Sequence, residues 1–389
     1  LGLPDLLGFC NSMKRKNPHK KIALCGCMMQ EQNVIDKLQK SYRFIDLIFG
    51  THNIFKFAEL LCRMFESSGM IIDIWKDSDQ IVEDLPVERK YPFKSGINIM
   101  FGCNNFCTYC IVPYVRGREK SRRPKEILQE IEKLADDGVV EIMLLGQNVN
   151  SYGKNLEDEI SFAQLLREVE KIDKIKRIRF MTSHPKDLSD ELIEVMKNSD
   201  KICRHLHLPL QSGSTKILKA MNRRDTKESL RKVFHDLRER VPGLVLRTSI
   251  IAGLPGEGEA EFEELCDFLR EEKIERAGVF PFSPEEGTKA AAMEHVSTEE
   301  AQRRTELLVD VQSEIIDAYN DSVLGDIREV LCEGWSEESQ SFVGRSYAES
   351  VDIDGKIYFS SNCDIMAGEF VNVRLTGTMD GELTGEAVE

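Results

Sequence analysis

The stretch Gly102-Cys103-Asn104-Asn105-Phe106-Cys107-Thr108-Tyr109-Cys110 places three cysteines in the order C-x-x-x-C-x-x-C. Three thiolates can bind three irons of a cubane iron–sulfur cluster, whereas such clusters normally take four cysteine ligands. The remaining iron is then open to an exchangeable ligand, and the amino and carboxylate groups of S-adenosylmethionine can chelate it. S-adenosylmethionine is one of the cofactors that carry radical chemistry. The stretch therefore predicts a 4Fe-4S cluster held by Cys103, Cys107 and Cys110, with S-adenosylmethionine on the open iron.

Two simpler interpretations explain these cysteines less well. A structural zinc site usually has two pairs of cysteine or histidine ligands about 12–20 residues apart, and no second pair follows Cys110 in the sequence. Isolated buried cysteines are common packing residues, but here three fall within eight positions. We therefore prefer the cluster over zinc binding and over plain packing, both of which stay open.

The longer stretch from Phe101 to Arg118, FGCNNFCTYCIVPYVRGR, resembles the radical S-adenosylmethionine superfamily and, within it, the methylthiotransferases. The resemblance implies that Tyr109 lies close to the bound cofactor. It also implies that the cluster reduces one S-adenosylmethionine to a 5′-deoxyadenosyl radical, which takes a hydrogen from an unreactive C–H bond. Sulfur from an auxiliary cluster, methylated by a second S-adenosylmethionine, then fills the vacancy. An electron donor such as a flavodoxin or a ferredoxin is implied as a partner.

The middle of the chain alternates between apolar strands and amphipathic helices, which indicates a parallel sheet with right-handed crossovers. Six strands are expected, at residues 97–101, 139–145, 177–181, 205–210, 244–251 and 277–282. Six such units predict an α/β fold with a partial (β/α)6 barrel, which is also the core of the superfamily that the chain resembles. Its predicted limits are residues 93–324. Barrel chemistry lies at the carboxyl ends of the strands, and the cysteine stretch follows the first of them.

The pattern changes after a long helix expected at about residues 298–323. Five short strands are expected at residues 328–332, 341–346, 357–360, 369–375 and 382–387. Such strands predict a small β-barrel over residues 325–389, and this part resembles the TRAM module that ends methylthiotransferases.

The first 69 residues predict a further α/β segment that is too short for a full domain, followed by a linker at residues 70–92. Gly26-Cys27-Met28-Met29-Gln30 resembles the third cysteine motif of the methylthiotransferase N-terminal domain, in which three cysteines hold an auxiliary 4Fe-4S cluster. Only Cys27 carries over as a ligand, because the two earlier cysteines of that pattern would precede Leu1. We therefore expect a domain truncated at its N-terminus, and the alternative for Cys27 is a buried structural cysteine.

Two loops after predicted strands are candidates for cofactor contacts. Gly253, Pro255 and Gly256 follow the fifth strand, where small residues allow a ligand to approach the backbone closely. Gln147 and Asn148 follow the second strand, and their amides could bind cofactor or substrate. An ordinary strand–helix connection would also explain the first loop, and a polar capping turn would also explain the second.

Composition narrows the class of protein. The chain has 389 residues, 41% of them hydrophobic, which is enough for two or three cores. No run reaches the roughly 18 apolar residues of a membrane span, so we expect no membrane contact. Eleven cysteines, an odd number, fit a reducing cytoplasm better than a disulfide framework.

Two branches of the family differ in substrate, and the chain resembles both. Segments 49–54, 145–153, 182–187 and 205–214 look like the branch that modifies isopentenyl-adenosine in the tRNA anticodon loop. From about Val241, segments 246–250, 281–288, 343–348 and 353–355 look like the branch that modifies an aspartate of a small-subunit ribosomal protein. A natural recombinant or an artefact of sequence assembly would account for the change.

The distribution of charge along the chain also points to two different substrates. Residues 325–389 carry fourteen acidic and four basic residues, so their net charge is 4 − 14 = −10. Such a segment should repel RNA and suit a basic protein. Five basic residues near the cysteines could instead bind tRNA phosphates, or could simply be solvated: Arg116, Arg118, Lys120, Arg122 and Arg123.

The preferred hypothesis is a radical methylthiotransferase that acts on tRNA. Its main rival is β-methylthiolation of the ribosomal-protein aspartate. Two non-catalytic hypotheses also stay open: an iron–sulfur electron carrier, and a protein that only binds RNA or the ribosome.

Overall fold

The computed structural model describes the chain except for residues 1–2, 77–80, 84, 86, 159 and 389. By its contacts the chain divides into two compact units. The smaller unit comprises Leu1–Val87, Gly102–Asn104 and Ile111–Glu119, and the larger comprises Glu88–Phe101, Asn105–Cys110 and Lys120–Glu389. The outermost limits of the predicted domains, and part of the predicted linker, fall outside the described residues.

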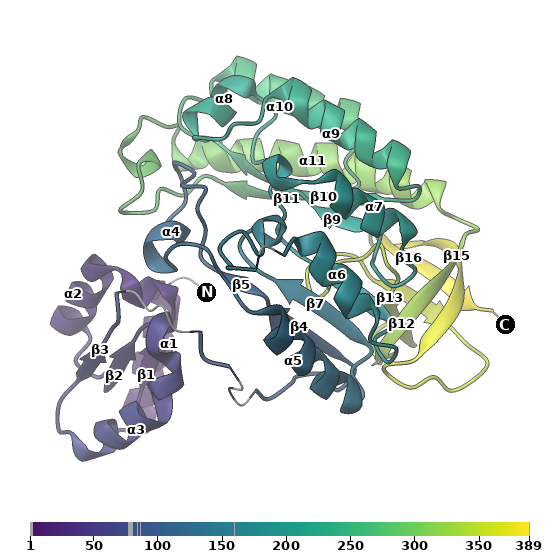
Figure 1. The fold of residues 1–389 in the computed structure, drawn as a ribbon. Coiled ribbons are helices and arrows are strands. Elements are labelled where there is room, and N and C mark those ends of the chain that lie inside the picture. The colour runs from purple at the N-terminus through teal and green to yellow at the C-terminus, as the bar shows by residue number, and fades with distance from the viewer. Residues whose placement is uncertain (1–2, 77–80, 84, 86, 159, 389) are drawn as a thin grey trace. The chain divides into compact units, whose positions relative to one another are not determined.

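The smaller unit is a three-stranded parallel sheet with helices (Figure 1). Its strands pair in the order β1 (Ala23–Cys25), β2 (Leu47–Phe49) and β3 (Ile71–Asp73). Its helices are α1 (Leu3–Lys16), α2 (Gln32–Ser41), α3 (Phe57–Glu66) and α4 (Val112–Val115), with 3-10 turns η1 (Cys27–Gln30) and η2 (Thr51–Lys56). The expected α/β character is present.

One expectation about this unit was wrong. Residues 70–92 were expected to be a linker, but Ile71–Asp73 forms β3 and pairs in parallel with β2. Each strand here has only three residues, too few for a periodic pattern to distinguish a strand from a connection.

The larger unit contains the six expected strands as two parallel three-stranded sheets. One sheet has the order β4 (Lys94–Asn98), β7 (Glu141–Leu145) and β8 (Arg177–Phe180), and the other has the order β9 (His205–His207), β10 (Val245–Ala252) and β11 (Arg276–Pro281). A parallel bridge between Ile178 and Ile202 connects the two sheets. The strands thus follow one another in chain order in an open arc, the predicted partial barrel. A short hairpin of β5 (Met100–Phe101) and β6 (Lys120–Ser121) flanks the first strand.

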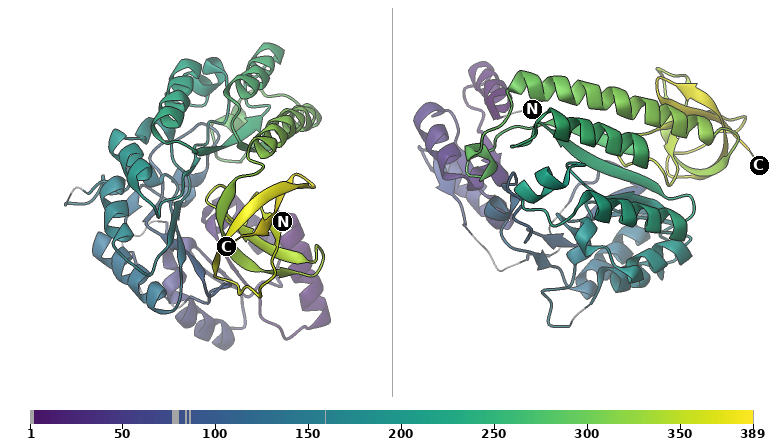
Figure 2. Two further views of the ribbon diagram at one scale, coloured as in Figure 1. Left: turned by 90° about the vertical axis from the view of Figure 1, so that its right-hand side faces the viewer. Right: turned by 90° about the horizontal axis from the view of Figure 1, so that it is seen from above.

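Helices cover the outside of this arc (Figure 2). They are α5 (Pro124–Asp136), α6 (Phe162–Glu170), α7 (Asp190–Asn198), α8 (Thr215–Ala220), α9 (Lys227–Arg240), α10 (Glu259–Glu272) and α11 (Thr298–Ser322), with 3-10 turns η3 (Val149–Ser151), η4 (Pro185–Asp187) and η5 (Ala290–Ala292). Local sequence explains their limits: Pro124 suits the first turn of α5, and Ser161 and Gln164 form a capping box at α6. Ile127 and Ile131 of α5 are fully buried in the main core. Burying this apolar face is what holds the helix on the sheet.

The last 65 residues form the expected β-barrel, closed in the order β12-β13-β14-β16-β15. Its strands are β12 (Ile327–Ser336), β13 (Ser341–Arg345), β14 (Ile357–Ser360), β15 (Phe370–Met379) and β16 (Glu382–Ala387). We call this part the barrel module. Alternate residues of β12 and β15, such as Val330, Cys332, Val373 and Leu375, fill its interior.

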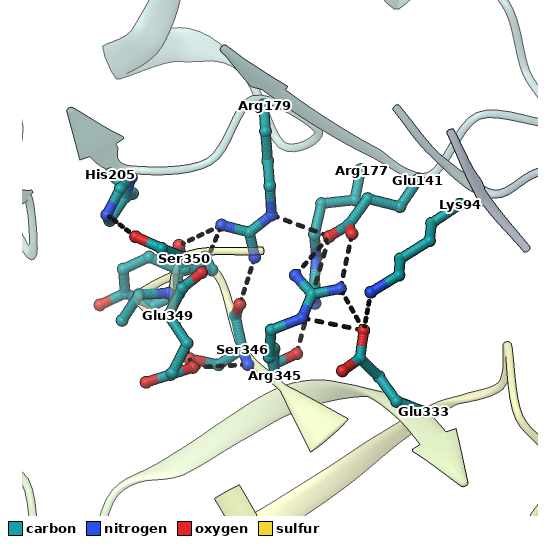
Figure 3. Close-up of polar contacts among 12 residues, drawn as sticks. Lys94, Glu141, Arg177, Arg179, His205, Glu333, Arg345, Ser346, Glu349 and Ser350 are labelled. Carbon is teal, nitrogen blue, oxygen red and sulfur yellow. Dashed lines mark hydrogen bonds and ion pairs between the residues drawn. The ribbon is translucent and has the colours of Figure 1, made fainter. Parts of the chain in front are cut away.

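The barrel module packs against the amino ends of the arc through a buried ionic network (Figure 3). Arg345 of β13, 1% exposed, pairs with Glu141 of β7 at 2.7 Å and with Glu333 of β12 at 2.7 Å. Lys94 of β4 also pairs with Glu333, at 2.6 Å. Because the Arg345–Glu141 pair spans 204 positions of sequence, the module and the arc form one folded body.

Candidate cofactor site

A cavity of about 320 Å³ lies at the carboxyl ends of β10 and β11. Its wall is mainly aromatic and apolar with a few polar groups: Tyr109, Gln211, Ser249, Ile251, Phe280, Pro281, Phe282 and Ser283. A mostly apolar cavity with few polar groups is the usual form of a small-molecule site. Tyr109 belongs to the cysteine stretch, so the structure brings one predicted cofactor residue to the end of the arc where barrel enzymes bind their ligands.

The hydroxyl of Tyr109 interacts with Arg223 and with the thiol of Cys107. Burial of this hydroxyl raises the pKa of Tyr109 well above its usual value, although the positive charge of Arg223 opposes that shift. The Arg223 guanidinium donates to the carbonyl of Pro209 at 2.7 Å and lies 3.4 Å from the Asp225 carboxylate. Tyr109 is therefore held neutral, with its ring on the cavity.

Hydrogen bonds fix the cysteine stretch to the body of the larger unit. The Thr108 amide donates to the carbonyl of Met221 at 3.0 Å, and its hydroxyl donates to Ala220 at 3.2 Å. The Thr108 carbonyl accepts from the amide of Ala290 at 3.0 Å. The Asn222 side chain donates to the carbonyl of Phe106 at 3.0 Å. These contacts hold the segment from Phe106 to Thr108 to the larger unit, and Tyr109, the next residue, lines the cavity.

The three cysteines suit a cluster in their chemistry. Cys103, Cys107 and Cys110 are all half-buried, which leaves a thiol accessible to iron, whereas Cys203, Cys266 and Cys332 are buried. Cys103 falls in the smaller unit and the other two in the larger. Within the described parts of the chain, no three His, Cys, Asp or Glu side chains form a group that could hold a metal ion. The donor set fits a cluster, and its ligation by these three residues stays a prediction.

A buried ion pair fixes the loop after β10 that contains Gly253, Pro255 and Gly256. Glu257, 3% exposed, accepts from the amide of Gly253 at 2.7 Å and pairs with Arg304 of α11 at 3.0 Å. A Cβ on Gly253 would lie 2.9 Å from the Cβ of Ala301, so packing against α11 explains this glycine. The cavity wall does not include Gly253, Pro255 or Gly256, and their cofactor contact stays a prediction.

Gln147 and Asn148 lie after β7 and outside the cavity wall. The Asn148 side chain donates to Asp187 at 2.7 Å and accepts from the amide of His184 at 3.1 Å, which matches the alternative of a polar capping turn. Among the described residues, Gln147 Oε1 is a buried oxygen without a hydrogen-bond partner. Gln147 is thus available to a ligand, whereas Asn148 is occupied in joining two loops.

In the smaller unit, Cys27 begins η1 directly after β1 and is half-buried. Gly26, with φ +151°, makes the turn between Cys25 and Cys27. Cys25 is exposed, and its thiol lies 3.8 Å from the carbonyl of Gly50. The position of Cys27 at the carboxyl end of a parallel strand is consistent with a ligand.

Two buried histidines and one arginine of the basic cluster have structural roles. His205 is buried with Nε2 3.2 Å from the Ser350 hydroxyl, and His207 is buried with Nδ1 3.2 Å from Arg247. Arg122 of the basic cluster is also buried and pairs with Glu130 at 2.7 Å. The Arg122 side chain is therefore too buried to bind tRNA phosphate.

Sequence reasoning missed several cavity residues, notably Gln211, Ser249 and Phe280. Gln211 has φ +70°, a left-handed conformation that non-glycine residues seldom adopt outside functional or tight turns. Phe280 is 55% exposed despite its aromatic side chain. The alternation of Arg247, Ser249 and Ile251 on the inward face of β10 was the one signal that could have indicated this lining.

Among the helices that the structure describes, none is both long and apolar enough to cross a membrane.

Comparison with known proteins identifies the two main parts of the chain and its family. The model of the radical SAM superfamily matches residues 97–269, and that of the TRAM domain matches residues 324–388. A tRNA-2-methylthio-N(6)-dimethylallyladenosine synthase of Lachnoclostridium phytofermentans is 50% identical over 98% of this chain and 83% of its own length. The enzyme of the same name from Alkaliphilus oremlandii is 48% identical over 98% of this chain and 80% of its own length.

One solved structure, coproporphyrinogen III oxidase (HemN) from Escherichia coli, covers 73% of this chain and 68% of its own at 11% identity, with a TM-score of 0.45. The relatives from Lachnoclostridium and Alkaliphilus extend through residues on both sides of Val241 under one name. This continuity favours the tRNA branch for the part that had resembled the ribosomal-protein branch. The chain belongs to the family of tRNA-2-methylthio-N(6)-dimethylallyladenosine synthases, radical SAM methylthiotransferases that bind a 4Fe-4S cluster and S-adenosylmethionine.

Proposed function

We propose that this chain adds a methylthio group to dimethylallyl-adenosine in the anticodon loop of tRNA. The observation that carries the proposal is the cavity that Tyr109 of the cysteine stretch shares with the ends of β10 and β11. The names of the relatives support the substrate.

The residues of the larger unit have distinct roles in this proposal. Cys107 and Cys110, with Cys103, bind the cluster through their thiolates. Tyr109 packs its ring against the cofactor, and Arg223 fixes its hydroxyl. When bound, the cluster and S-adenosylmethionine supply a radical that can take hydrogen from an unactivated carbon. Phe280, Phe282 and Ile251 exclude water from that carbon with their apolar side chains.

The smaller unit supplies Cys27 to the auxiliary cluster in this proposal. The half-buried thiol of Cys27 is at the end of a parallel strand, where ligands commonly bind in α/β sheets. A flavodoxin or a ferredoxin serves as the external electron donor.

In the decisive experiment, the chain is reconstituted without oxygen and incubated with S-adenosylmethionine and a reductant. tRNA and a small-subunit ribosomal protein are offered to it in separate reactions. tRNA carrying dimethylallyl-adenosine should gain the mass of one SCH₂ unit, and tRNA without the dimethylallyl group should not. Mass spectrometry of digested tRNA measures the gain. If neither the tRNA nor the ribosomal protein is modified, the assignment of this chain as a methylthiotransferase is overturned.

A small-subunit ribosomal protein is the second arm, because the barrel module has a net charge of −10 and could attract a basic protein. We expect no SCH₂ gain on its aspartate. Modification of the protein and not of the tRNA would reverse the substrate assignment.

A further inference from the structure

Two loops at the mouth of the arc carry buried polar atoms that the described chain does not satisfy. They are residues 146–151 after β7 and 182–187 after β8, and we call them the paired loops. In the first, Asn150 is 8% exposed, and both atoms of its amide lack a hydrogen-bond partner among the described residues. In the second, Ser183 is 1% exposed, and its hydroxyl is likewise unsatisfied within the described chain. A buried polar group without a partner is costly, so these atoms indicate a site that a ligand completes.

Hydrogen bonds join the paired loops to each other. The Val149 amide donates to the carbonyl of Thr182 at 3.1 Å. The Asn148 side chain donates to Asp187 at 2.7 Å and accepts from the amide of His184 at 3.1 Å. Thr182 has φ +64°, which is an outlier for a β-branched residue. Such a conformation persists only where the surroundings enforce it, commonly at ligand sites. The paired loops therefore form one fixed unit.

The paired loops lie on the same edge of the arc as the cavity. The Ser183 amide donates to the carbonyl of His207, the last residue of β9, at 3.1 Å. Strand β9 pairs in parallel with β10, whose Ser249 lines the cavity. Because these strands run in one direction, their carboxyl ends meet at one mouth.

The charge of one arginine also links the two places. Burial, with the positive charge of Arg223 next in effect, lowers the pKa of His184 in the paired loops to about 3. Arg223 also interacts with the hydroxyl of Tyr109, whose ring lines the cavity. Arg223 is thus near both the paired loops and the cavity wall.

The unsatisfied amide of Asn150 specifies the chemistry of the ligand. An amide side chain offers N–H donors beside a carbonyl acceptor. Adenine presents the complementary edge, with the N7 acceptor beside the N6–H donor, and an asparagine can bind both at once. A phosphate offers only acceptors and an ammonium only donors, so either would leave one atom of the amide unpaired. Asp187, the acid of the paired loops, is already compensated by Lys154 at 2.6 Å, which suits a neutral ligand.

Two adenines take part in the proposed reaction, that of S-adenosylmethionine and that of the tRNA. The cofactor is assigned to the cavity at β10 and β11, whereas Asn150 follows β7 and lies outside the cavity wall. The relatives are named for a product with its methylthio group at position 2 of the base, across the ring from N7. An amide on N7 and N6–H would leave C2 free, and N6 keeps one hydrogen after it carries the dimethylallyl group. The target base therefore fits Asn150 without obstruction of the reacting carbon.

We propose that Asn150 binds the adenine of the target nucleoside by its N7 and N6–H edge, and that the paired loops form the wall of this nucleobase site. Unstacked bases of RNA loops are commonly recognised by hydrogen bonds to such edges. The proposal rests on the proposed function, because it takes tRNA as the substrate.

The contact is tested by a change of one atom in the RNA. An anticodon stem-loop RNA with N6-dimethylallyladenosine is compared with its 7-deaza analogue, in which C–H replaces N7. The Kd of each RNA is measured for the anaerobic holoenzyme at one salt concentration. Wild type should bind the 7-deaza RNA about tenfold more weakly, since a bidentate pair supplies discrimination of about that size. Equal binding of the two RNAs by wild type would overturn the proposal, and this comparison requires no variant.

Asn150→Ala attributes the loss to this side chain. The variant should bind the ordinary RNA about tenfold more weakly than wild type does, and it should not distinguish the two RNAs, because N7 has lost its partner. If the losses from the variant and from the 7-deaza base multiply, Asn150 does not contact N7. Asn198→Ala, at the exposed end of α7, is the matched control and should keep both wild-type Kd values.

Binding of S-adenosylmethionine separates the two adenines. Asn150→Ala should keep the Kd of S-adenosylmethionine within about twofold of wild type. Weaker binding of S-adenosylmethionine with unchanged binding of RNA would assign the amide to the cofactor and overturn the proposal. A lower Tm with both Kd values unchanged would make Asn150 a structural residue, which would also overturn it.

Asn150→Asp serves if Asn150→Ala does not fold, because a carboxylate has the size of the amide but cannot donate to N7. This variant should also bind the two RNAs equally, and a preference like that of wild type would contradict the proposal. A wild-type chain that binds the RNA but adds no SCH₂ unit would overturn the proposed function, whereas the base contact would still be judged by the two RNAs. A wild-type chain that binds neither RNA would overturn both.

Discussion

The two ends of the arc in the larger unit differ in how their polar side chains are satisfied. At the base, Arg179 makes four hydrogen bonds, and Glu141 is held by Arg179 and Arg345. At the mouth, Asn150 is 8% exposed, and neither atom of its amide has a hydrogen-bond partner among the described residues. The base is held by many contacts within the chain, although Arg276 Nε and Glu349 Oε1 there are buried without a hydrogen-bond partner among the described residues. At the mouth, the whole side-chain amide of Asn150 is available to a bound ligand. Stability and function are therefore separated along the axis of the arc.

The largest expected effect lies at the mouth. Cys107→Ala removes one of three thiolates from a cluster that has no spare ligand, so iron content should fall and cleavage of S-adenosylmethionine should become undetectable. Iron assay and product analysis on anaerobically purified protein measure both. Cys266→Ala, at a buried packing position of α10, should retain iron and activity. If Cys107→Ala keeps its iron, the cluster assignment fails.

At the base, Glu141→Gln should destabilise the larger unit by about 3–5 kcal/mol, because it removes the buried carboxylate that pairs with both Arg179 and Arg345. Denaturant unfolding gives the change. Glu168→Gln, at a surface pair with Lys171, should change stability by less than about 0.5 kcal/mol. Similar losses in the two variants would remove the distinction between base and surface.

Acid should destabilise the larger unit through the buried histidines at its base. Burial lowers the pKa of His207 to about 4, and Arg247 adds to that effect. Burial, with Arg179 nearby, holds the pKa of His205 well below its usual range. Because the unfolded histidines take up protons near pH 6.5 and the folded ones do not, stability is full above that pH. It declines as the pH falls from about 6.5 towards 4, by about 3 kcal/mol for His207 alone.

The measurement is the free energy of unfolding between pH 7.5 and 4.5 for wild type and for His205→Gln/His207→Gln. The double variant should show a flatter decline over this range. Parallel curves for the two proteins would show that other groups control the acid response.

The smallest effect concerns the hydroxyl of Tyr109. Tyr109→Phe keeps the ring on the cavity and loses the interactions of the hydroxyl with Arg223 and Cys107, so binding of S-adenosylmethionine should weaken by about fivefold. Tyr109→Ala also removes the wall of the cavity and should weaken binding further. Titration calorimetry compares the two variants, and equal losses would show that the ring itself contributes nothing.

Local patterns were sufficient for most of the architecture. Stretches such as Glu141–Leu145 and Val245–Ala252 are recognisable because strands of a buried parallel sheet are mainly hydrophobic, although each of these also carries a charged residue. The five strands of the barrel module were also predicted, since turns separate them clearly. Strand β3 was missed because three residues carry no period, and α8 because six residues are hardly two turns.

The site was predictable only where a motif carries its own chemistry. The spacing of Cys103, Cys107 and Cys110 indicates a cluster without reference to the fold. Gln211 gave no such signal, because its place in the cavity depends on a left-handed backbone that the sequence does not reveal. Arg345 was counted as a charge of an acidic tail, yet it is buried against Glu141. Pairings of such long sequence separation are set by the fold, and local patterning cannot show them.

That separation has a consequence for synthesis. A ribosome finishes β11 well before it reaches Arg345 of β13, a delay of several seconds at about 5–20 residues per second. During that time Glu141, Arg177 and Arg179 lack their partners in the barrel module. The nascent arc should be an easy target for proteases until the C-terminal residues arrive. A premature stop codon before β13 would therefore cost the cell a stable arc and not only the barrel module.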